Sequence, residues 1–151
     1  MPVIRQSYEV YAPPARIAEL FDNAQNAVTI VPHLVDASIT DSSFVTVWEG
    51  KLGPIKKRFT LNGRITEQSL GHFGFVGDGE GLKVRGTAEY TAINPEKTLL
   101  TVEVEIDPGR GIIAGIVDHI IANEKDENLS YVRRKLAENL KARVEPVTAA
   151  S

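Results

Sequence analysis

The residues with the clearest chemical potential lie at 109–114, where the chain reads Gly-Arg-Gly-Ile-Ile-Ala. Gly109, Gly111 and Ala114 have the spacing of a dinucleotide fingerprint, in which a glycine-rich turn brings a helix start against a pyrophosphate. That fingerprint requires a strand on each side of the helix and an acidic residue about 20 residues further on. No strand pattern follows this helix, and no acidic strand end lies at that distance. We therefore interpret the glycines as a flexible strand-to-helix junction.

The three histidines give weak support for catalysis or metal binding. His33, His72 and His119 are far apart without metal-ligand spacing, and the chain has no cysteine. His119 follows Asp118 within an isoleucine-rich segment, which is the placement from which a histidine could reach an interior cavity. A single histidine specifies little by itself. We predict no catalytic residue, no metal site and no cofactor.

Composition narrows the class of protein. A chain of 151 residues fits one domain, and its net charge of −3 argues against a general nucleic-acid binder. The first residues lack the apolar run of a signal peptide, and no segment approaches the roughly 20 apolar residues of a membrane span. We therefore expect a cytoplasmic protein, with peripheral association at the inner membrane face as a further alternative.

Hydrophobic periodicity predicts the elements that would position a site. Alternation at 3–11 predicts a strand, and helical spacing follows at 15–21 and 24–30. Six further strand patterns with short links then predict an antiparallel meander between 34 and 106. We expect a single domain over residues 1–144 and a loose tail over 145–151.

Turn signals suggest the register of the central hairpins. A tight Asn-Pro-Glu loop would place Gly86 opposite Val104, both facing inward. An Asp-Gly turn at 78–79 would place Phe75 opposite Leu82.

The stretch KLGPIKKRF at 51–59 contains four cations around a Gly-Pro pair. Gly-Pro predicts a hairpin turn, and the alternation after it separates Phe59 from Lys56 and Arg58. We interpret these cations as the solvated outside of a hairpin and not as a nucleic-acid surface.

The helical segment at 111–143 contains two apolar stripes that cannot face one sheet. Their centres differ by roughly 150° at about 100° per residue. Between them, residues 122–128 are polar throughout. Either the helix breaks there, or one stripe, from Ile112 to Ile121, faces a protein partner, a membrane surface or the two short helices.

The predicted order of elements is that of the helix-grip fold, an α+β fold. YEVYAPPARIAELFDN at 8–23 resembles the strand-to-helix entry of the START/Bet v 1-like (SRPBCC) superfamily. IVPHLVDASI, EGKLGPIKKRFTLNGRI and LSYVRRKLAENLKARV resemble, within it, the CoxG-like family of carbon monoxide dehydrogenase accessory proteins. One departure is His33, where that family usually has glycine after the proline.

The resemblance implies a curved seven-stranded antiparallel sheet that grips a long C-terminal helix, with two short helices after the first strand. It also implies an accessory protein that carries a lipid- or quinone-like molecule in an apolar cavity near the membrane.

The residues independently offer inward apolar side chains, which either fill a closed core or line such a cavity. Interior glycines such as Gly63, Gly74 and Gly86 favour the cavity, since glycine leaves space in a sheet. The expected lining is Trp48, Phe59, Leu61, Phe73, Phe75, Leu82, Val84, Tyr90, Val102, Val104, Ile113, Ile116 and Val117.

Three functions follow as hypotheses. The first is a non-enzymatic carrier of a hydrophobic small molecule. The second is an enzyme of the polyketide cyclase or dehydratase type, which needs Asp118 with His119, or Tyr90, inside the cavity. The third is an interaction module that docks or dimerises through the stripe from Ile112 to Ile121.

Overall fold

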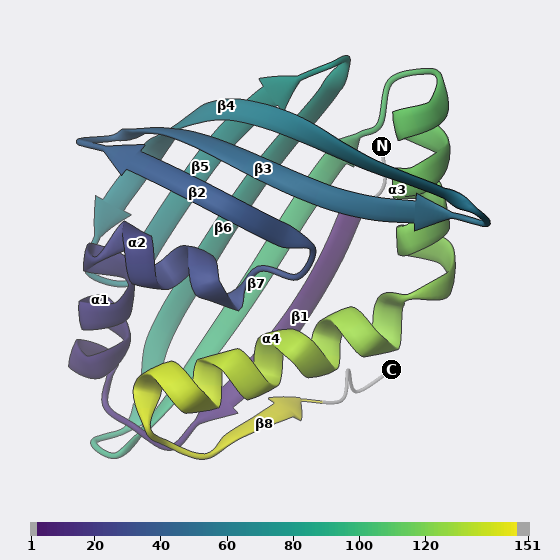
Figure 1. The fold of residues 1–151 in the computed structure, drawn as a ribbon. Coiled ribbons are helices and arrows are strands. Elements are labelled where there is room, and N and C mark those ends of the chain that lie inside the picture. Colours follow the sequence, from purple (N-terminus) through teal and green to yellow (C-terminus); the bar gives the residue numbers. More distant parts are fainter. Residues whose placement is uncertain (1–2, 148–151) are drawn as a thin grey trace.

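In a computed structural model, which describes residues 3–147, one antiparallel sheet curves around the C-terminal helices (Figure 1). Its strands follow the order β2-β3-β4-β5-β6-β7-β1-β8, so the predicted meander is confirmed. The strands are β1 (Val3–Val10), β2 (Leu34–Thr40), β3 (Ser43–Leu52), β4 (Ile55–Ser69), β5 (His72–Gly79), β6 (Leu82–Asn94), β7 (Lys97–Asp107) and β8 (Val144–Val147).

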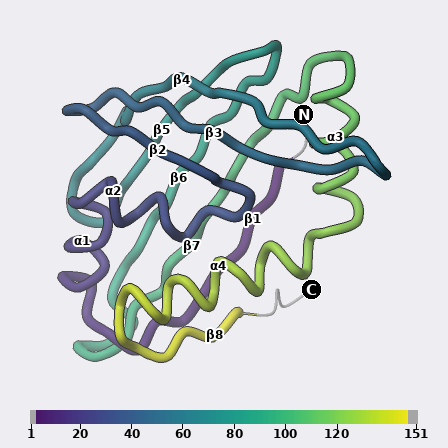
Figure 2. The backbone as a smooth tube through the Cα atoms, viewed as in Figure 1, coloured from purple at the N-terminus to yellow at the C-terminus, as the bar shows by residue number. Residues whose placement is uncertain are grey.

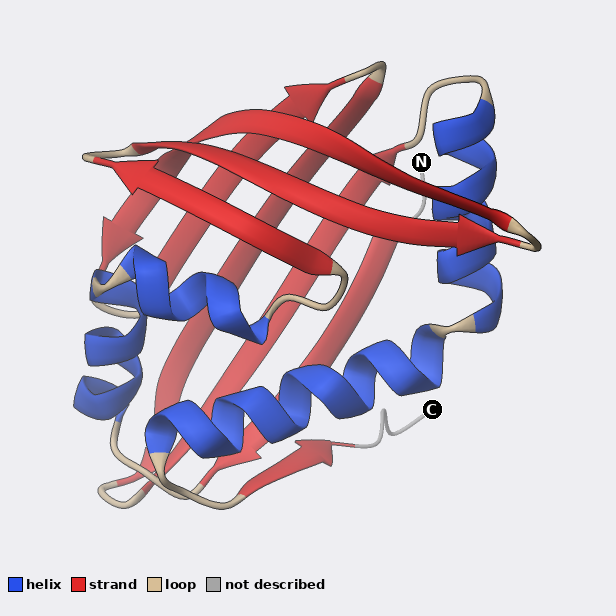
Figure 3. Ribbon diagram, viewed as in Figure 1, coloured by secondary structure: helices blue, strands red, loops and turns tan. Residues whose placement is uncertain are grey.

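The helices gather on one side of the sheet, and strands β2 to β4 bend across in front of β5 to β7 (Figure 3). The two short helices after β1 arise where the Pro13-Pro14 pair ends the strand and Pro14 opens the first turn. The helical elements are α1 (Pro14–Asp22), α2 (Ala24–Ala27), the 3-10 turn η1 (Val28–Ile30), α3 (Ile112–Asn123) and α4 (Lys125–Leu140).

The C-terminal helix is broken, which the incompatible stripes had indicated. The chain turns sharply between α3 and α4 (Figure 2), at Asn123 and Glu124. The α3 stripe buries Ile116 near β3, whereas α4 buries Leu136 and Leu140 in a separate cluster. Each stripe therefore has its own target inside the molecule. Most of the Ile112–Ile121 stripe faces inward, since of its residues only Ile112 is a large exposed hydrophobic. Docking of a partner or a membrane through this stripe remains a prediction.

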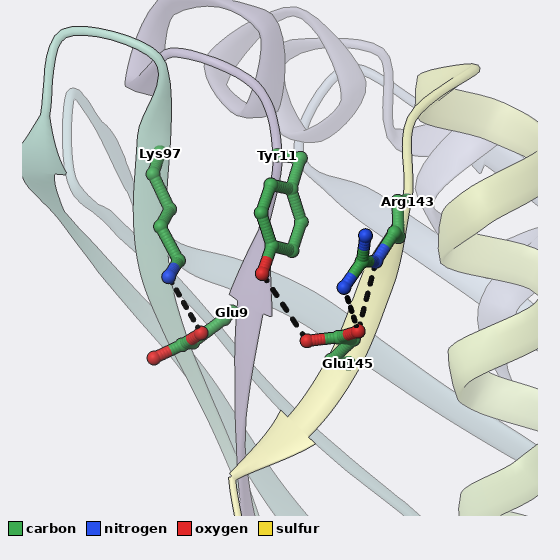
Figure 4. Close-up of polar contacts among 5 residues, drawn as sticks. All are labelled: Glu9, Tyr11, Lys97, Arg143 and Glu145. Carbon is green, nitrogen blue, oxygen red and sulfur yellow. Dashed lines mark hydrogen bonds and ion pairs between the residues drawn. The ribbon is translucent and has the colours of Figure 1, made fainter.

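An eighth strand corrects the predicted count of seven. Residues 145–147, assigned to a loose tail, belong to β8, which pairs with β1; residues 148–151 lie outside the described part. Figure 4 shows what holds β8: the Tyr11 hydroxyl donates to the Glu145 carboxylate at 3.2 Å, and Arg143 binds the same carboxylate. These Arg143 hydrogen bonds hold the pKa of Glu145 below its ordinary value.

The two register predictions had different outcomes. Gly86 lies opposite Val104, as predicted. The turn between β5 and β6 instead falls at Glu80 and Gly81, with φ of 53° and 85°, and this places Phe75 opposite Gly86. Asp78-Gly79 and Glu80-Gly81 are both turn signals in the sequence. The prediction placed the turn at the first pair, whereas the structure has it at the second. The inward faces are unchanged, because the pairing moved by an even number of residues.

Candidate ligand-binding face

The inner face of the sheet carries two separate packed clusters. The larger lies under α1 and α4, where Ile17, Leu100 and Leu136 are fully buried. The smaller lies under α3, where Ile113 and Val117 pack with Phe59. The helix break produces this division, because each half of the C-terminal segment covers one region of the face.

Between the clusters the inner face carries half-buried aromatic and aliphatic side chains. Phe75 and Val104 belong to neither cluster and are half-buried. Phe44 contacts Phe75 edge to face, with ring centroids 6.0 Å apart. Apolar side chains that retain contact with water on a concave face provide a surface that an apolar ligand could cover.

The interior glycines act differently from the expectation. A Cβ at Gly86 would overlap the Phe75 ring, and one at Gly63 would overlap both the backbone carbonyl of Val76 and the ring of Phe44. The space that these glycines leave is therefore filled by the two rings. Gly74 lies between the inward Phe73 and Phe75 and so points to the outer face. Sequence reasoning missed Phe44, although its alternation with Thr46 and Trp48 places it on the inner face.

The predicted lining residues all lie in or near these clusters but do not form one group. Those in the smaller cluster or packed against it are Trp48, Phe59, Leu61, Leu82, Val84, Ile113 and Val117. Tyr90 is buried in the larger cluster, with Phe73 and Val102 packed against it. Ile116 is fully buried beside Gly50. As ligand contacts these residues remain a prediction.

Polar groups on the inner face are paired within the protein. The Trp48 indole donates to the Thr46 hydroxyl at 2.8 Å, and that hydroxyl donates to the Leu61 carbonyl at 3.2 Å. The Tyr8 hydroxyl donates to the Leu129 carbonyl of α4 at 3.5 Å. Burial raises the pKa of Tyr8 to about 12, against the opposing effect of the Arg133 guanidinium. Tyr8 is therefore a neutral hydrogen-bonding group at ordinary pH.

His33 joins the sheet edge to the helix break. Its Nε2 lies 3.1 Å from Oδ1 of Asn128 and 3.8 Å from a carboxylate oxygen of Glu124. Its carbonyl accepts from the Glu49 amide at 3.0 Å, which extends the β2–β3 pairing. His33 has φ of 68°, a conformation that glycine adopts readily. The His33 side chain thus ties the η1–β2 loop to Asn128 of α4 and to Glu124 at the break between α3 and α4.

The enzyme hypothesis needs either Asp118 with His119, or Tyr90, inside a cavity. Asp118 is exposed, and His119 lies 3.2 Å from the side-chain nitrogen of Asn123 on its own helix. Tyr90 is buried and stacks on Phe21, with ring centroids 5.9 Å apart. His72 lies exposed near Glu89, on the outward face expected for it.

Two clefts open on the surface away from the predicted lining. One, of about 400 Å³, lies between the α1–α2 junction, β2 and β4 and is bordered by Asp22, Gln25 and Gln68. The other, of about 360 Å³, lies between α1 and the end of α4, beside Arg16 and Lys141. Neither is lined by a residue of the expected cavity. Both have many polar side chains, so neither resembles an apolar ligand pocket.

Two classes of site can be assessed over residues 3–147. No group of three or more histidine, cysteine, aspartate or glutamate side chains in this range is placed to hold a metal ion. No helix in the same range has the length and hydropathy to cross a bilayer.

Comparison with known proteins identifies the architecture. No family model matches the chain, and no curated protein matches it. A START superfamily protein from Mycobacterium smegmatis has a solved structure with a TM-score of 0.68 and 14% identity, covering 92% of this chain and 97% of that one. The fold is the helix-grip fold.

Two further solved structures share the helix-grip fold with this chain. A conserved protein from Geobacillus kaustophilus has a TM-score of 0.69 at 14% identity, covering 94% of this chain and 99% of its own. The Zhui aromatase/cyclase from Streptomyces sp. R1128 has a TM-score of 0.54 at 14% identity, covering 93% and 89%. Identities this low indicate a shared fold and leave the activity to be argued from the site.

Proposed function

We propose that the protein binds a hydrophobic small molecule, lipid- or quinone-like, on the inner face of its sheet and carries it without transforming it. In this proposal it is accessory to a redox or membrane system, as the resemblance to the CoxG-like family suggests. The observation that carries the proposal is the half-buried apolar surface around Phe75 and Val104, between two packed clusters. The likeness to a START superfamily structure supports it.

The energetics are compatible with a carrier. Covering apolar surface contributes about 25 cal/mol per Å², so a few hundred Å² of contact contributes several kcal/mol before the costs of association. The paired polar groups near this surface, Trp48 with Thr46 and Tyr8 with Leu129, leave few hydrogen bonds for a polar ligand to satisfy. An apolar ligand is therefore favoured over a polar one.

The experiment compares the same substitution on the two faces of the sheet. Val104 lies in the centre of the inner face, between Gly86 and Ile4, whereas Val45 is exposed on the outer face. Val104→Phe should fill the proposed site and lower affinity for a fluorescent apolar probe such as Nile red at least tenfold. Val45→Phe should leave the affinity unchanged.

Native mass spectrometry of protein purified from its own host should also show a bound apolar molecule. If wild-type protein is consistently empty and binds no apolar probe, the carrier function is wrong. Equal probe affinity in the two phenylalanine variants would place binding elsewhere than on the inner face.

A further inference from the structure

The turn between β3 and β4 carries two aliphatic side chains beside α3, of which Ile55 is exposed and Leu52 is half-buried. Leu52 and Ile55 are paired across the Gly53-Pro54 turn and therefore share one face of the hairpin. A Cβ at Gly115 of α3 would lie 3.3 Å from Leu52, so this face of the hairpin rests on the helix. Ile55 next to the contact is 44% exposed, and Ile112, one turn before Gly115, is 54% exposed. In Figure 1 this hairpin projects past α3 at the edge of the molecule.

Cations lie on both faces of this hairpin: Lys57 shares the face of Ile55, whereas Lys51, Lys56 and Arg58 lie on the opposite face. Lys51, Lys56, Lys57 and Arg58 are all exposed, in a chain whose net charge is −3. Glu49 pairs with two of them, at 3.4 Å from Lys56 and 3.3 Å from Arg58. Lys51 and Lys57 form no ion pair with any residue of 3–147. We call residues 51–58 together with Ile112 the basic tip.

We propose that the basic tip docks on the surface of an anionic lipid bilayer. Lysine side chains place their charge among anionic headgroups while their methylene stems lie along apolar surface. Ile55 at the end of the hairpin and Ile112 on α3 beside it can enter the boundary between headgroups and acyl chains, where exposed aliphatic side chains are stabilised. The tip therefore presents both kinds of group that such a surface attracts.

Other occupants fit the basic tip less well. Nucleic-acid surfaces combine cations with aromatic side chains for base stacking, and residues 51–58 contain none. A specific protein interface covers about 800 Å² on each partner, whereas the basic tip offers two exposed isoleucines, Ile55 on the turn and Ile112 on α3. A bilayer surface requires no complementary shape, only cations that reach its headgroups and apolar side chains that enter its acyl boundary.

Docking of this kind is reversible and sensitive to salt. Each lysine near an anionic surface contributes about fivefold to partitioning. The screening length of salt is about 8 Å at physiological ionic strength, and interactions between exposed charges are weak beyond it. Binding should therefore weaken as the salt concentration rises. The proposal does not require a ligand on the inner face, so it stands or falls separately from the carrier function.

The test is co-sedimentation with vesicles of phosphatidylcholine alone and of equal parts phosphatidylcholine and phosphatidylglycerol. Wild-type protein should bind the mixed vesicles at low salt and dissociate from them at high salt. It should not bind the neutral vesicles. The double variant Lys51→Gln, Lys57→Gln removes the two unpaired lysines and should weaken binding about 25-fold, by two fivefold steps. Ile55→Ser should weaken it about tenfold, by loss of one apolar side chain.

A matched control exists at the turn between β4 and β5. Leu70 is the most exposed of the large hydrophobic side chains described, at 73%, and no lysine or arginine occurs from residue 65 to 82. Leu70→Ser removes comparable apolar surface and should leave vesicle binding unchanged. Absence of binding to mixed vesicles at low salt would overturn the proposal. So would equal losses from Leu70→Ser and Ile55→Ser, or binding to a DNA oligonucleotide that is as strong and loses equally from the lysine variant.

Discussion

The two ends of the inner face differ in how completely they are packed. Under α1 and α4 the packing is complete, because Ile17, Leu100 and Leu136 have no exposed surface. We call this region the closed end. Under α3, the buried Phe59 and Val117 are accompanied by the half-buried Trp48 and Val84. The two ends share only β6 and β7: the closed end adds β1, whereas the other end adds β3 and β4. They therefore differ both in their strands and in the helices that cover them.

This difference suggests that one end of the inner face stabilises the fold and the other end responds to a ligand. The closed end combines two helices, the β1–β7–β6 core and the Phe21 ring, which stacks on Phe73 with centroids 5.1 Å apart. At the other end, α3 is a short helix that packs mainly on β3. A carrier needs a rigid part and a part that can adjust, and regions with fewer buried contacts open at lower cost. We therefore expect stability to be concentrated under α4 and ligand response under α3.

The largest expected effect tests that division directly. Leu136→Ala removes a fully buried side chain from the closed end and should lower the free energy of unfolding by about 3 kcal/mol. Val84→Ala removes a half-buried side chain from the other end and should cost less than about 1 kcal/mol, because surrounding groups already contact water. Urea denaturation measures both. Similar losses would show that the two ends contribute equally.

A smaller effect tests how α3 is attached. A Cβ at Gly50 would overlap Cγ2 of the fully buried Ile116, so Gly50→Ala should push α3 from β3 at a cost of about 2 kcal/mol. Amide exchange should accelerate in α3 and remain slow in α4. Gly77→Ala is the matched control, because there the nearest atoms to a Cβ are at ordinary contact distances, from 3.6 Å. Fast exchange across both helices after Gly50→Ala would contradict independent attachment.

The fold was predictable because local signals agreed along most of the chain. Alternation located the strands, and the pairing of Gly86 with Val104 followed from one short loop. The same alternation continued past the wrong turn at 78–79, so the inward faces were right although the pairing was not. β8 was missed because four residues including a proline carry no strand signal, and pairing with β1 stabilises them.

The site was less predictable because hydrophobic periodicity does not determine how side chains pack against one another. Alternation places a side chain on a face but does not say whether Tyr90 is sealed in a cluster or Phe75 is left half-exposed. The glycines suggested empty space, yet rings from neighbouring strands occupy it at Gly63 and Gly86. The role of His33 depends on Asn128, 95 residues away in sequence, and no local pattern indicates such a contact.

The smallest effect at neutral pH concerns Tyr8, which is buried in the closed cluster while its hydroxyl reaches Leu129 of α4. Tyr8→Phe removes one long hydrogen bond of 3.5 Å and should change stability at pH 7 by about 0.5 kcal/mol or less.

The same residue has a larger effect in alkali. Its pKa is raised to about 12 by burial, so below pH 10 it is neutral in both the folded and the unfolded state. Above pH 10 the unfolded state ionises first, and this lowers the free energy of unfolding of the wild type by up to about 2 kcal/mol as the pH approaches 12. Tyr8→Phe lacks this loss, so the variant should become the more stable protein in alkali. Urea denaturation at pH 7, 10 and 11 measures the crossing. Parallel pH profiles of the two proteins would mean that water reaches the Tyr8 hydroxyl. Tyr8 would then lie outside the closed end of the inner face.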